Sequence, residues 1–485
     1  MNNDRQRITS FSLLLMTFSA VFSFPSIINN SIQIGLATIP AYLFGSIFYF
    51  FPFALMIAEF ASANSESESG IHSWIKSALG DKWAFLGAWS YFFVNLFFFT
   101  SLVPNTLIYC SYTFLGRNIF NGENMTLIIS GISIIVFWLA TYISIKGVDW
   151  LSKITDVAGV AKIFMGIIFI VLAFVVILFL GESPAQEFSV ETIKPKFNWT
   201  FFMTMAWILQ AVGGAESVGV YVKDVKGGNK AFVKAMIIST VAICGLYVLG
   251  CIAVGLVVPK EVLNKNFSNG IFDVFTILSS HFGVSANITN RIVGLILLLS
   301  NLGSLVIWTA APVKVLFSEI PEGIFGKWIA KTDDLGNPKN ALLVQAVIVT
   351  VLLLVPALGI GSMDSFLETL INMTASTSLI PVLFFLIAYI VLRAKKDYLE
   401  RDFKMGNRGF GITAGVGLLL VFIFVFFMST VPEPKLIAQA LSGTLPKGEA
   451  NPILILVYNV AGLVIFLGFA LIRWNRYSKN NKNKI

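Results

Sequence analysis

The sequence contains few of the residues that usually build catalytic and metal centres. Only two of its 485 residues are histidines and three are cysteines. His72 and His281 fall in expected loops, and Cys110, Cys244 and Cys251 show no paired spacing. Neither a disulfide framework nor a metal-binding motif follows from this pattern. We therefore expect no metal, no cofactor and no enzymatic activity.

Charge is scarce as well, and long apolar runs take its place. Charged residues make up 12% of the chain, against roughly 25% in soluble domains, and 56% of the chain is hydrophobic. A run of about 20 apolar residues is long enough to cross the roughly 30 Å hydrocarbon layer of a membrane. The sequence predicts an all-α integral membrane protein with twelve such helices, at 8–34, 38–62, 82–115, 126–145, 154–180, 201–222, 231–258, 292–316, 341–360, 367–392, 411–431 and 452–472.

The basic residues indicate how the chain lies in the membrane. Lysine and arginine are enriched in the cytoplasmic loops of membrane proteins, and here they favour the two termini and the even-numbered loops. We therefore expect both termini in the cytoplasm. The net charge of +8 is accounted for by anionic lipid headgroups beside the helix ends, so membrane lipid is an expected partner and nucleic acid is not.

Two of the predicted spans contain residues that interrupt a helix. Residues 23–27 (Ser-Phe-Pro-Ser-Ile) break the first span, because Pro25 lacks an amide proton and its ring clashes with the preceding turn. Residues 213–217 (Gly-Gly-Ala-Glu-Ser) break the sixth span with two glycines beside a carboxylate. Unwound backbone survives inside a membrane only where it faces protein or a cavity. Interrupted helices at matching positions indicate the substrate site of a secondary transporter.

The five-span separation of the two breaks also predicts the domain organisation. It favours two five-helix halves of opposite orientation, 1–180 and 181–392, followed by two further helices and a short basic tail at 393–485. Three of the longer interruptions, which contain Trp74, Phe272 and Trp328, are expected to hold short helices lying against the membrane portion.

The ends of the broken helices suit a substrate with both charges. Free amides at a helix start favour an anion, and free carbonyls at a helix end favour a cation. We expect a carboxylate at Ser26, Ile27, Gly213 and Gly214 and an ammonium at carbonyls near Ser23 and Gln210, an arrangement that predicts an amino acid headgroup. Phe24 and Ala215 belong to the same two breaks.

Several polar or aromatic side chains within the spans are candidates for contact with the rest of the substrate. Each has an alternative role, because Asn and Thr inside a membrane often bond neighbouring helices, and a Trp can face lipid. These candidates are Gln210, Asn95, Asn301, Trp308, Asn372 and Thr374.

Two charged residues lie deep in the spans. A charge at the middle of the membrane costs about 2.5 to 3.5 kcal/mol on insertion scales, so Glu216 must be compensated. It either takes part in proton or conformational coupling, or only accepts hydrogen bonds from helix 1. Lys162 either bridges helices 1 and 5 or reaches towards the cytoplasmic interface.

The loop from Glu66 to Trp74, which follows Glu59 at the cytoplasmic end of helix 2, allows two interpretations. Its small and acidic residues would let it fold back as a gate. It can equally be a solvated connector.

These residues carry a resemblance to a known family. The chain resembles the amino acid-polyamine-organocation superfamily, and within it the glutamate:GABA antiporter family and its relatives, across essentially all twelve helices. The matching stretches are FPFALMIAE at 51–59 with GIHSW at 70–74, DVAGVAK at 156–162, GGAESVGVYVKDVK at 213–226 and PVK at 312–314.

The resemblance implies an inverted five-plus-five helix fold, alternating access and an amino acid site between broken helices 1 and 6. Glu216 matches a helix 6 glutamate used in coupling. Lys162 matches a helix 5 lysine that stands in the sodium position of other members, which implies sodium independence. The chain departs from the family pattern at Gln210, where some antiporters carry a gating Trp, and in helix 1, which lacks the Gly-x-Gly pattern.

We therefore expect an amino acid antiporter of a bacterial plasma (inner) membrane. Exchange of glutamate, or a similar polar amino acid, for another amino acid or its decarboxylated amine is the leading hypothesis. Proton-coupled symport is the alternative within transport, and a non-transporting scaffold or a channel is the alternative from another class. The oligomeric state stays open between a monomer and a homodimer.

Overall fold

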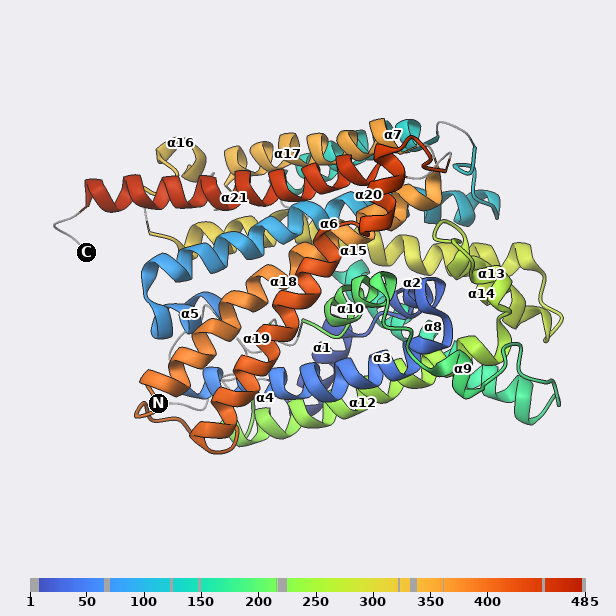
Figure 1. Ribbon diagram of the computed structural model, residues 1–485, viewed down its shortest axis with the longest axis horizontal. Helices are drawn as coiled ribbons and strands as arrows, with labels where there is room; N and C mark the ends of the chain where they lie inside the picture. Colours follow the sequence, from blue (N-terminus) through green and yellow to red (C-terminus); the bar gives the residue numbers. More distant parts are fainter. Residues whose placement is uncertain are drawn as a thin grey trace.

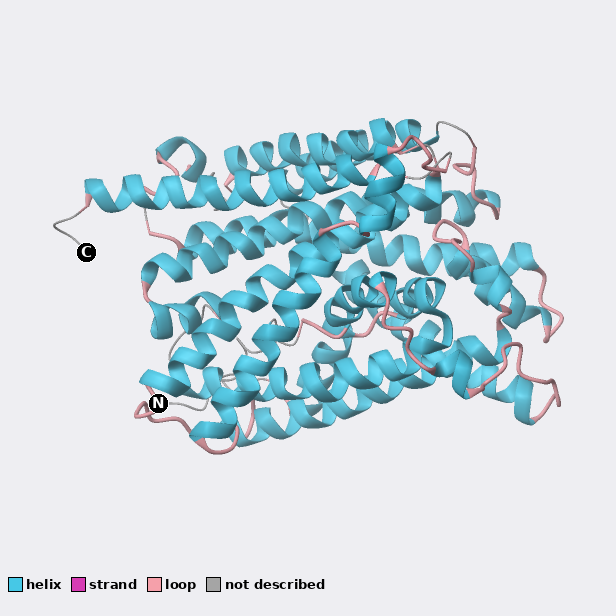
Figure 2. Ribbon diagram, in the orientation of Figure 1, coloured by secondary structure: helices cyan, strands magenta, loops and turns pink. Residues whose placement is uncertain are grey.

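The protein is built from helices throughout the part of the chain that the structure describes. The computed structural model describes residues 8–64, 70–122, 125–146, 150–214, 216, 225–321, 323–331, 338–360, 362–446 and 450–481. Across these ranges no strand is present, and the only strand-like contact is an isolated bridge between Ile8 and Val225 (Figure 2). The all-α prediction is confirmed.

The helices follow the predicted spans closely in order and in position. Their bounds are α1 Ser10–Val21, α2 Phe24–Ile34, η1 Gly35–Ala37, α3 Thr38–Phe44, η2 Gly45–Phe50, α4 Phe51–Ala63, α5 Ile71–Leu79, α6 Asp81–Leu115, α7 Met125–Lys146, α8 Trp150–Leu178, α9 Val190–Ile193, α10 Trp199–Ala211, α12 Gly228–Val257, α13 Lys260–Leu263, α14 Gly270–Ser280, α15 Ala286–Glu319, α16 Lys327–Ala330, α17 Lys339–Gly359, α18 Met363–Lys395, α19 Arg408–Thr430, α20 Pro434–Leu441 and α21 Pro452–Asn480.

Within the described ranges, ten helical stretches are long and apolar enough to cross a membrane. The predicted spans at 8–34 and 201–222 are the two without a counterpart of their own. The reason is that α1 stops at Val21 and α10 stops at Ala211, after 12 and 13 residues. The second half of the first span runs on into the next one, as a 40-residue stretch from Phe24 to Ala63.

The first break has a simple backbone geometry. Phe22 and Ser23 adopt extended conformations, with ψ of 124° and 103°, between the end of α1 and the start of α2. Pro25 lies in the first turn of α2, where its missing amide proton costs nothing and its fixed φ suits the helix. The proline therefore prevents the chain before it from continuing as a helix while it starts the next one.

The second break begins at the end of α10. The Val212 amide still donates to the Ile208 carbonyl (3.0 Å), and the Gly213 amide donates to the Gln210 carbonyl (3.1 Å). Gly214 then has a φ of +106°, which L side chains rarely adopt. Ala215 and the predicted continuation at 217–222 lie outside the described residues.

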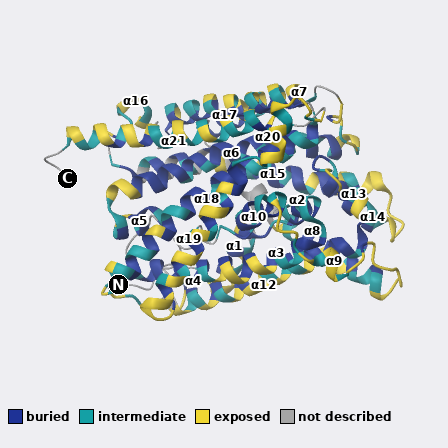
Figure 3. Ribbon diagram, viewed as in Figure 1, coloured by how far each residue is buried: buried dark blue, intermediate teal, exposed yellow. Residues whose placement is uncertain are grey.

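Burial distinguishes central helices from peripheral ones. The most apolar stretch of α6 is 72% buried and that of α21 only 11%, so α6 lies at the centre and α21 at the margin (Figure 3). Helix α6 packs most extensively against α15 and α18. In the view of Figure 1, α21 and α17 form one edge and α12 the opposite edge, with α2 and α10 between them.

The connecting segments divide between the two ends of the bundle. Helices α5 and α16 lie at one end together with the last turns of α21, and α9, α13 and α14 lie at the other (Figure 1). The short helices expected around Trp74 and Phe272 are confirmed as α5 and α14, with both side chains buried. The third, α16, is also present and contacts α17, although the Trp328 side chain is 63% exposed.

Candidate functional site

The two breaks meet at one side chain, the hydroxyl of Tyr247 in α12. This hydroxyl accepts the Ser23 amide proton (3.1 Å) and lies within donating distance of two carbonyl oxygens, that of Val21 (2.7 Å) and that of Ala211 (2.8 Å). Val21 ends α1 and Ala211 ends α10. Backbone groups from both interrupted helices therefore lie within hydrogen-bonding distance of the same oxygen atom.

The position of this hydroxyl is fixed by packing. Tyr247 is fully buried, and its ring stacks on Tyr42 of α3, with centroids 4.6 Å apart and an angle of 12°. The ring of Phe22, in the first break, lies 5.4 Å away on a tilted plane. The Tyr42 hydroxyl is occupied elsewhere, since it accepts the side-chain amide of Asn30 at 2.7 Å.

The meeting point concentrates backbone dipoles of both signs. The carbonyl ends of α1 and α10 carry the negative ends of two helix dipoles, and the start of α2 carries a positive end. The Ser23 side chain does not cap α2, so it leaves that helix start without the side-chain acceptor that a serine at this position usually supplies. A small solute with separated charges of both signs is the ligand that this arrangement suits.

Glycines allow the elements around the breaks to come close. A Cβ on Gly214 would lie 3.2 Å from the Ala20 carbonyl oxygen of α1. A Cβ on Gly166 of α8 would lie 3.0 Å from both Phe22 Cε1 and Phe24 Cβ. Both distances are shorter than ordinary contacts, so side chains at these two positions would push the first break away from α10 and α8.

Glu216 links the second break to α6. Its carboxylate accepts the Gly214 amide proton at 3.1 Å and the hydroxyl proton of Tyr91 at 3.2 Å. The acceptor role expected for this carboxylate is present, but the donors in the described residues are Gly214 and Tyr91 rather than amides of helix 1. The carboxylate therefore joins the unwound segment to the most buried helix of the bundle.

Lys162 lies in α8, one turn before Gly166, which contacts the first break. Its side chain is half-buried, and within the described ranges its ammonium makes no hydrogen bond or ion pair. Lys162 therefore lies near the first break, as expected for a residue beside helix 1. A bridge to helix 1 stays a prediction.

Two candidates for substrate contact, Asn95 and Asn301, instead form hydrogen bonds with protein groups. Asn95 donates to the Tyr91 carbonyl one turn earlier in α6 (2.9 Å). Asn301 of α15 is buried and donates to the Thr106 hydroxyl of α6 (3.3 Å). Asn301 therefore bonds a neighbouring helix, as the alternative role proposes, whereas the bond of Asn95 lies within α6 itself.

Asn372 and Thr374 of α18 also join helices. The Asn372 side chain accepts the indole proton of Trp207 in α10 (2.9 Å) and donates to the Ser429 carbonyl of α19 (2.8 Å). Thr374 donates to the Phe97 carbonyl of α6 at 3.0 Å. Trp207 is thereby held against α18, so α10 is tied to the bundle about one turn before its broken end.

The apolar candidates Phe24, Ile27 and Trp308 differ in how far their side chains are buried. The side chains of Phe24 and Ile27 are fully buried, and Phe24 packs on Phe169 with ring centroids 4.8 Å apart. Only the backbone of these two residues is available to a ligand. Trp308 of α15 is 36% exposed and faces the ring of Phe98 edge-on at 6.2 Å.

Three polar side chains at the breaks are unengaged. Ser23, Ser26 and Gln210 are half-buried, and in the described part of the chain none of their side chains makes a hydrogen bond. The Ser26 amide donates to the Ser23 carbonyl at 3.1 Å. The two hydroxyls and the Gln210 amide can therefore form new hydrogen bonds without breaking existing ones.

A cavity of about 940 Å³ lies at the far ends of the two half-helices from the breaks. It is lined by Ile34 and Gly35 at the end of α2, by Phe201 of α10, and by Lys194 and Lys260 from the adjoining loops. Water therefore approaches the outer ends of α2 and α10, one helix length away from the meeting point.

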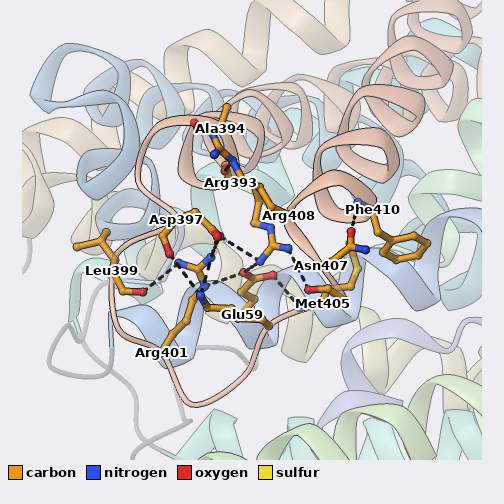
Figure 4. Close-up of polar contacts among 12 residues, drawn as sticks. Glu59, Arg393, Ala394, Asp397, Leu399, Arg401, Met405, Asn407, Arg408 and Phe410 are labelled. Carbon is orange, nitrogen blue, oxygen red and sulfur yellow. Dashed lines mark hydrogen bonds and ion pairs between the residues drawn. The ribbon is translucent and has the colours of Figure 1, made fainter.

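A second polar centre, at the opposite end of the bundle, was not expected from the sequence. Glu59 of α4 is fully buried, and its carboxylate accepts hydrogen bonds from Arg393 of α18 at 2.8 Å and from Arg401 at 2.7 Å (Figure 4). It also accepts the hydroxyl proton of Tyr389 at 2.7 Å. Both arginines also pair with Asp397. We call Glu59, Tyr389, Arg393, Asp397 and Arg401 the Glu59 cluster.

The Glu59 cluster fixes the end of α4 to α18 and α19. The Met405 amide donates to Glu59 at 3.0 Å, and Arg393 donates to the Gly406 carbonyl at 3.0 Å. A Cβ on Gly411 of α19 would lie 2.5 Å from Arg393 Nε, so this glycine makes room for the buried guanidinium. The cluster contains two acidic and two basic side chains, so its charges balance.

The loop considered as a gate is described only in part. Residues 65–69 lie outside the described residues, whereas Trp74 of α5 is buried beside Phe60 (6.2 Å) and Phe385 (6.1 Å between ring centroids). The second half of this loop is therefore a packed helix, and gating by the first half stays a prediction.

Comparison with known proteins identifies the family of this chain. Over residues 8–445 the chain matches a family model described as amino acid permease. It is 27% identical to the aspartate/glutamate permease AcaP of Lactococcus lactis subsp. cremoris over 439 residues, which cover 89% of each chain.

Two further relatives are similar over comparable lengths. The glutamate/gamma-aminobutyrate antiporter of Lactococcus lactis subsp. lactis is 25% identical over 441 residues, 89% of this chain and 85% of the relative. The inner membrane transporter YjeM of Escherichia coli is 24% identical over 465 residues, 91% and 92% of the two chains. The resemblance inferred from the motifs is confirmed: the chain is a multi-pass membrane protein that belongs to the amino acid permease family.

Proposed function

We propose that this protein is an amino acid antiporter that works by alternating access and binds the headgroup of its substrate where α1, α2 and α10 meet. The observation that carries this proposal is the convergence of both broken helices on the Tyr247 hydroxyl. The carboxylate would lie at the start of α2, near the Ile27 amide and the hydroxyls of Ser23 and Ser26. The amides of Ser26 and Gly213 already donate to backbone carbonyls. The ammonium would lie at the carbonyl ends of α1 and α10.

The proposed substrate is glutamate or a similar polar amino acid, exchanged for another amino acid or its decarboxylated amine. Support comes from the names of two relatives, an aspartate/glutamate permease and a glutamate/gamma-aminobutyrate antiporter. The unengaged side chains of Ser23, Ser26 and Gln210 offer hydrogen bonds to such a solute. Trp308 remains a candidate for contact with the rest of the substrate.

The proposed architecture is twelve crossings arranged as an inverted repeat, 1–180 and 181–392, with two additional helices. Counting the two interrupted spans together with the ten continuous stretches gives twelve. An even number of crossings places both termini on one side, which we propose is the cytoplasm of a bacterial cell.

Transport is proposed to be independent of sodium. The half-buried ammonium of Lys162, one turn from the glycine that contacts the first break, repels a second cation at that position. Replacing sodium by choline on both sides of the membrane should therefore leave the rate of exchange unchanged, and a strict sodium requirement would contradict this part of the proposal.

Purified protein in proteoliposomes tests the function. Vesicles loaded with one unlabelled amino acid, or with γ-aminobutyrate, are offered labelled aspartate or glutamate outside. Saturable uptake that depends on the internal load is the expected result. A folded protein that moves none of these compounds would refute the transport hypothesis and favour the alternative of a non-transporting scaffold. Flux that never saturates would indicate a channel.

Proton-coupled symport is the second candidate, favoured by the deep carboxylate of Glu216 and its hydrogen bond to Tyr91. This candidate would be supported if the labelled amino acid accumulates only under an imposed proton gradient and does so without any amino acid inside the vesicles. The variant Glu216→Gln keeps the size of the side chain and removes the titratable group, so we expect it to fold and to alter the pH profile of transport. An unchanged profile would remove Glu216 from coupling.

A further inference from the structure

The Tyr247 hydroxyl has one proton and two carbonyl oxygens within reach. A phenolic hydroxyl donates one hydrogen bond and accepts others. It accepts the Ser23 amide, and its single proton is shared between the carbonyls of Val21 (2.7 Å) and Ala211 (2.8 Å). At any moment one of the two broken helices lacks its donor from Tyr247.

The two carbonyls differ in their surroundings. Val21 is only 3% exposed, whereas Ala211 is half-buried beside the unengaged side chain of Gln210. A ligand can therefore approach the Ala211 carbonyl without opening the α1 side of the junction. A substrate ammonium has three donors, and charged hydrogen bonds are roughly twice as strong as neutral ones. The ammonium would donate a hydrogen bond to the Ala211 carbonyl, and the Tyr247 hydroxyl would then donate its proton to the Val21 carbonyl alone.

We propose that Tyr247 is a positioning residue that makes exchange obligatory, an inference that rests on the proposed function. In the empty carrier its hydroxyl links α1, α10 and α12 and so resists the movement of α10 that reorientation requires. In the loaded carrier the substrate ammonium replaces it at Ala211 and releases α10 from α12. The empty carrier is thereby slow to reorient and the loaded one is not.

The neighbouring Tyr42 provides a matched control. Its ring forms the other half of the stack with Tyr247, it is also fully buried, and its hydroxyl contacts the Asn30 side chain. Tyr42→Phe removes a hydroxyl from the same aromatic pair without touching the backbone of either break. Tyr247→Phe removes the hydroxyl that links the breaks and keeps its ring.

The experiment measures efflux of a labelled amino acid that the wild type exchanges, with and without unlabelled amino acid outside. For the wild type and for Tyr42→Phe we expect efflux to depend strongly on the external amino acid. For Tyr247→Phe we expect net efflux about fivefold faster, the factor that corresponds to a lost hydrogen bond of about 1 kcal/mol. The ratio of exchange to net efflux should fall accordingly.

A second arm uses only the wild type, so it decides the question even if Tyr247→Phe does not fold. Glutarate has both carboxylates of glutamate and no amino group, so it cannot replace the hydroxyl at Ala211. External glutarate should therefore fail to accelerate efflux of labelled glutamate, whereas external glutamate accelerates it. An unchanged ratio in folded Tyr247→Phe, or acceleration by glutarate equal to that by glutamate, overturns the inference. A wild type that exchanges no amino acid refutes the proposed function itself.

Discussion

The Glu59 cluster gives the sharpest prediction about stability. Replacing Glu59 by glutamine keeps the shape of the side chain and removes its charge. The carboxylate accepts two guanidinium groups, a tyrosine hydroxyl and the Met405 amide. Glutamine has one oxygen acceptor in place of two, and its NH₂ group would face donors. Asp397 alone would then have to balance Arg393 and Arg401, whose side chains are fully buried.

The size of the effect follows from this burial. Removing one partner of a buried ion pair costs about 3 to 5 kcal/mol, because it leaves an uncompensated charge in a place that water does not reach. Glu59 pairs with two arginines, and Asp397 remains as a partner for both. Because Asp397 still pairs with both arginines, the loss of stability is limited. We therefore expect Glu59→Gln to lower the free energy of unfolding by an amount within that range and not by twice as much.

The assay is thermal unfolding of purified protein in detergent, with Glu182→Gln as the matched control. Glu182 is exposed in the segment after α8, so the same chemical change there should leave the unfolding temperature within error of the wild type. We expect a clear fall for Glu59→Gln and a smaller one for Tyr389→Phe, which removes one neutral donor. Unfolding of Glu59→Gln at the wild-type temperature would refute the assignment of the cluster as a structural anchor.

Two further predictions concern single sites. Gly214→Ala should weaken exchange severely, because its φ of +106° costs about 1 to 3 kcal/mol for a side chain and its Cβ would meet the Ala20 carbonyl at 3.2 Å. Gly283→Ala is the control with positive φ and nothing within 4 Å, and full activity of both variants would contradict the close approach. Burial raises the pKa of the Asp273 carboxyl in α14 despite a hydrogen bond from a neighbouring asparagine. The charged form is thus disfavoured in the folded state, so Asp273→Asn should stabilise the protein at neutral pH, with a gain that shrinks as the pH falls; a gain that grows in acid would reverse the sign.

The all-helical fold and the approximate positions of the two breaks were predictable because their signals are local. Apolar runs mark the helices, the glycine pair at 213–214 follows the end of α10, and Pro25 lies in the first turn of α2, just after the first break. The first break was predicted at 23–27 but lies at Phe22 and Ser23, because residues 24–27 already belong to α2. The second begins after Ala211, two residues before the predicted start at Gly213. The exact partners of Glu216 were not predictable, because they depend on which helix packs beside the second break.

The residues that hold the site together gave no such signal. Tyr247 lies in an apolar helix, as does Tyr142 of α7, which is 58% exposed at the surface. Only the packing of α12 against both breaks gives Tyr247 its role. Glu59 and Arg393 are 334 positions apart in the chain, and no spacing rule relates them. The sequence placed Glu59 at a helix end without indicating its burial.

The central claim is that a small solute carrying both charges binds where the two interrupted helices meet. Its most direct test is calorimetric binding of glutamate to purified wild type and to Gly214→Ala, with glutarate as the ligand that lacks the ammonium. We predict saturable binding of glutamate to the wild type, strongly weakened binding to Gly214→Ala, and weak binding of glutarate to both. Equal affinity of both proteins for both ligands would place the site elsewhere and contradict the account.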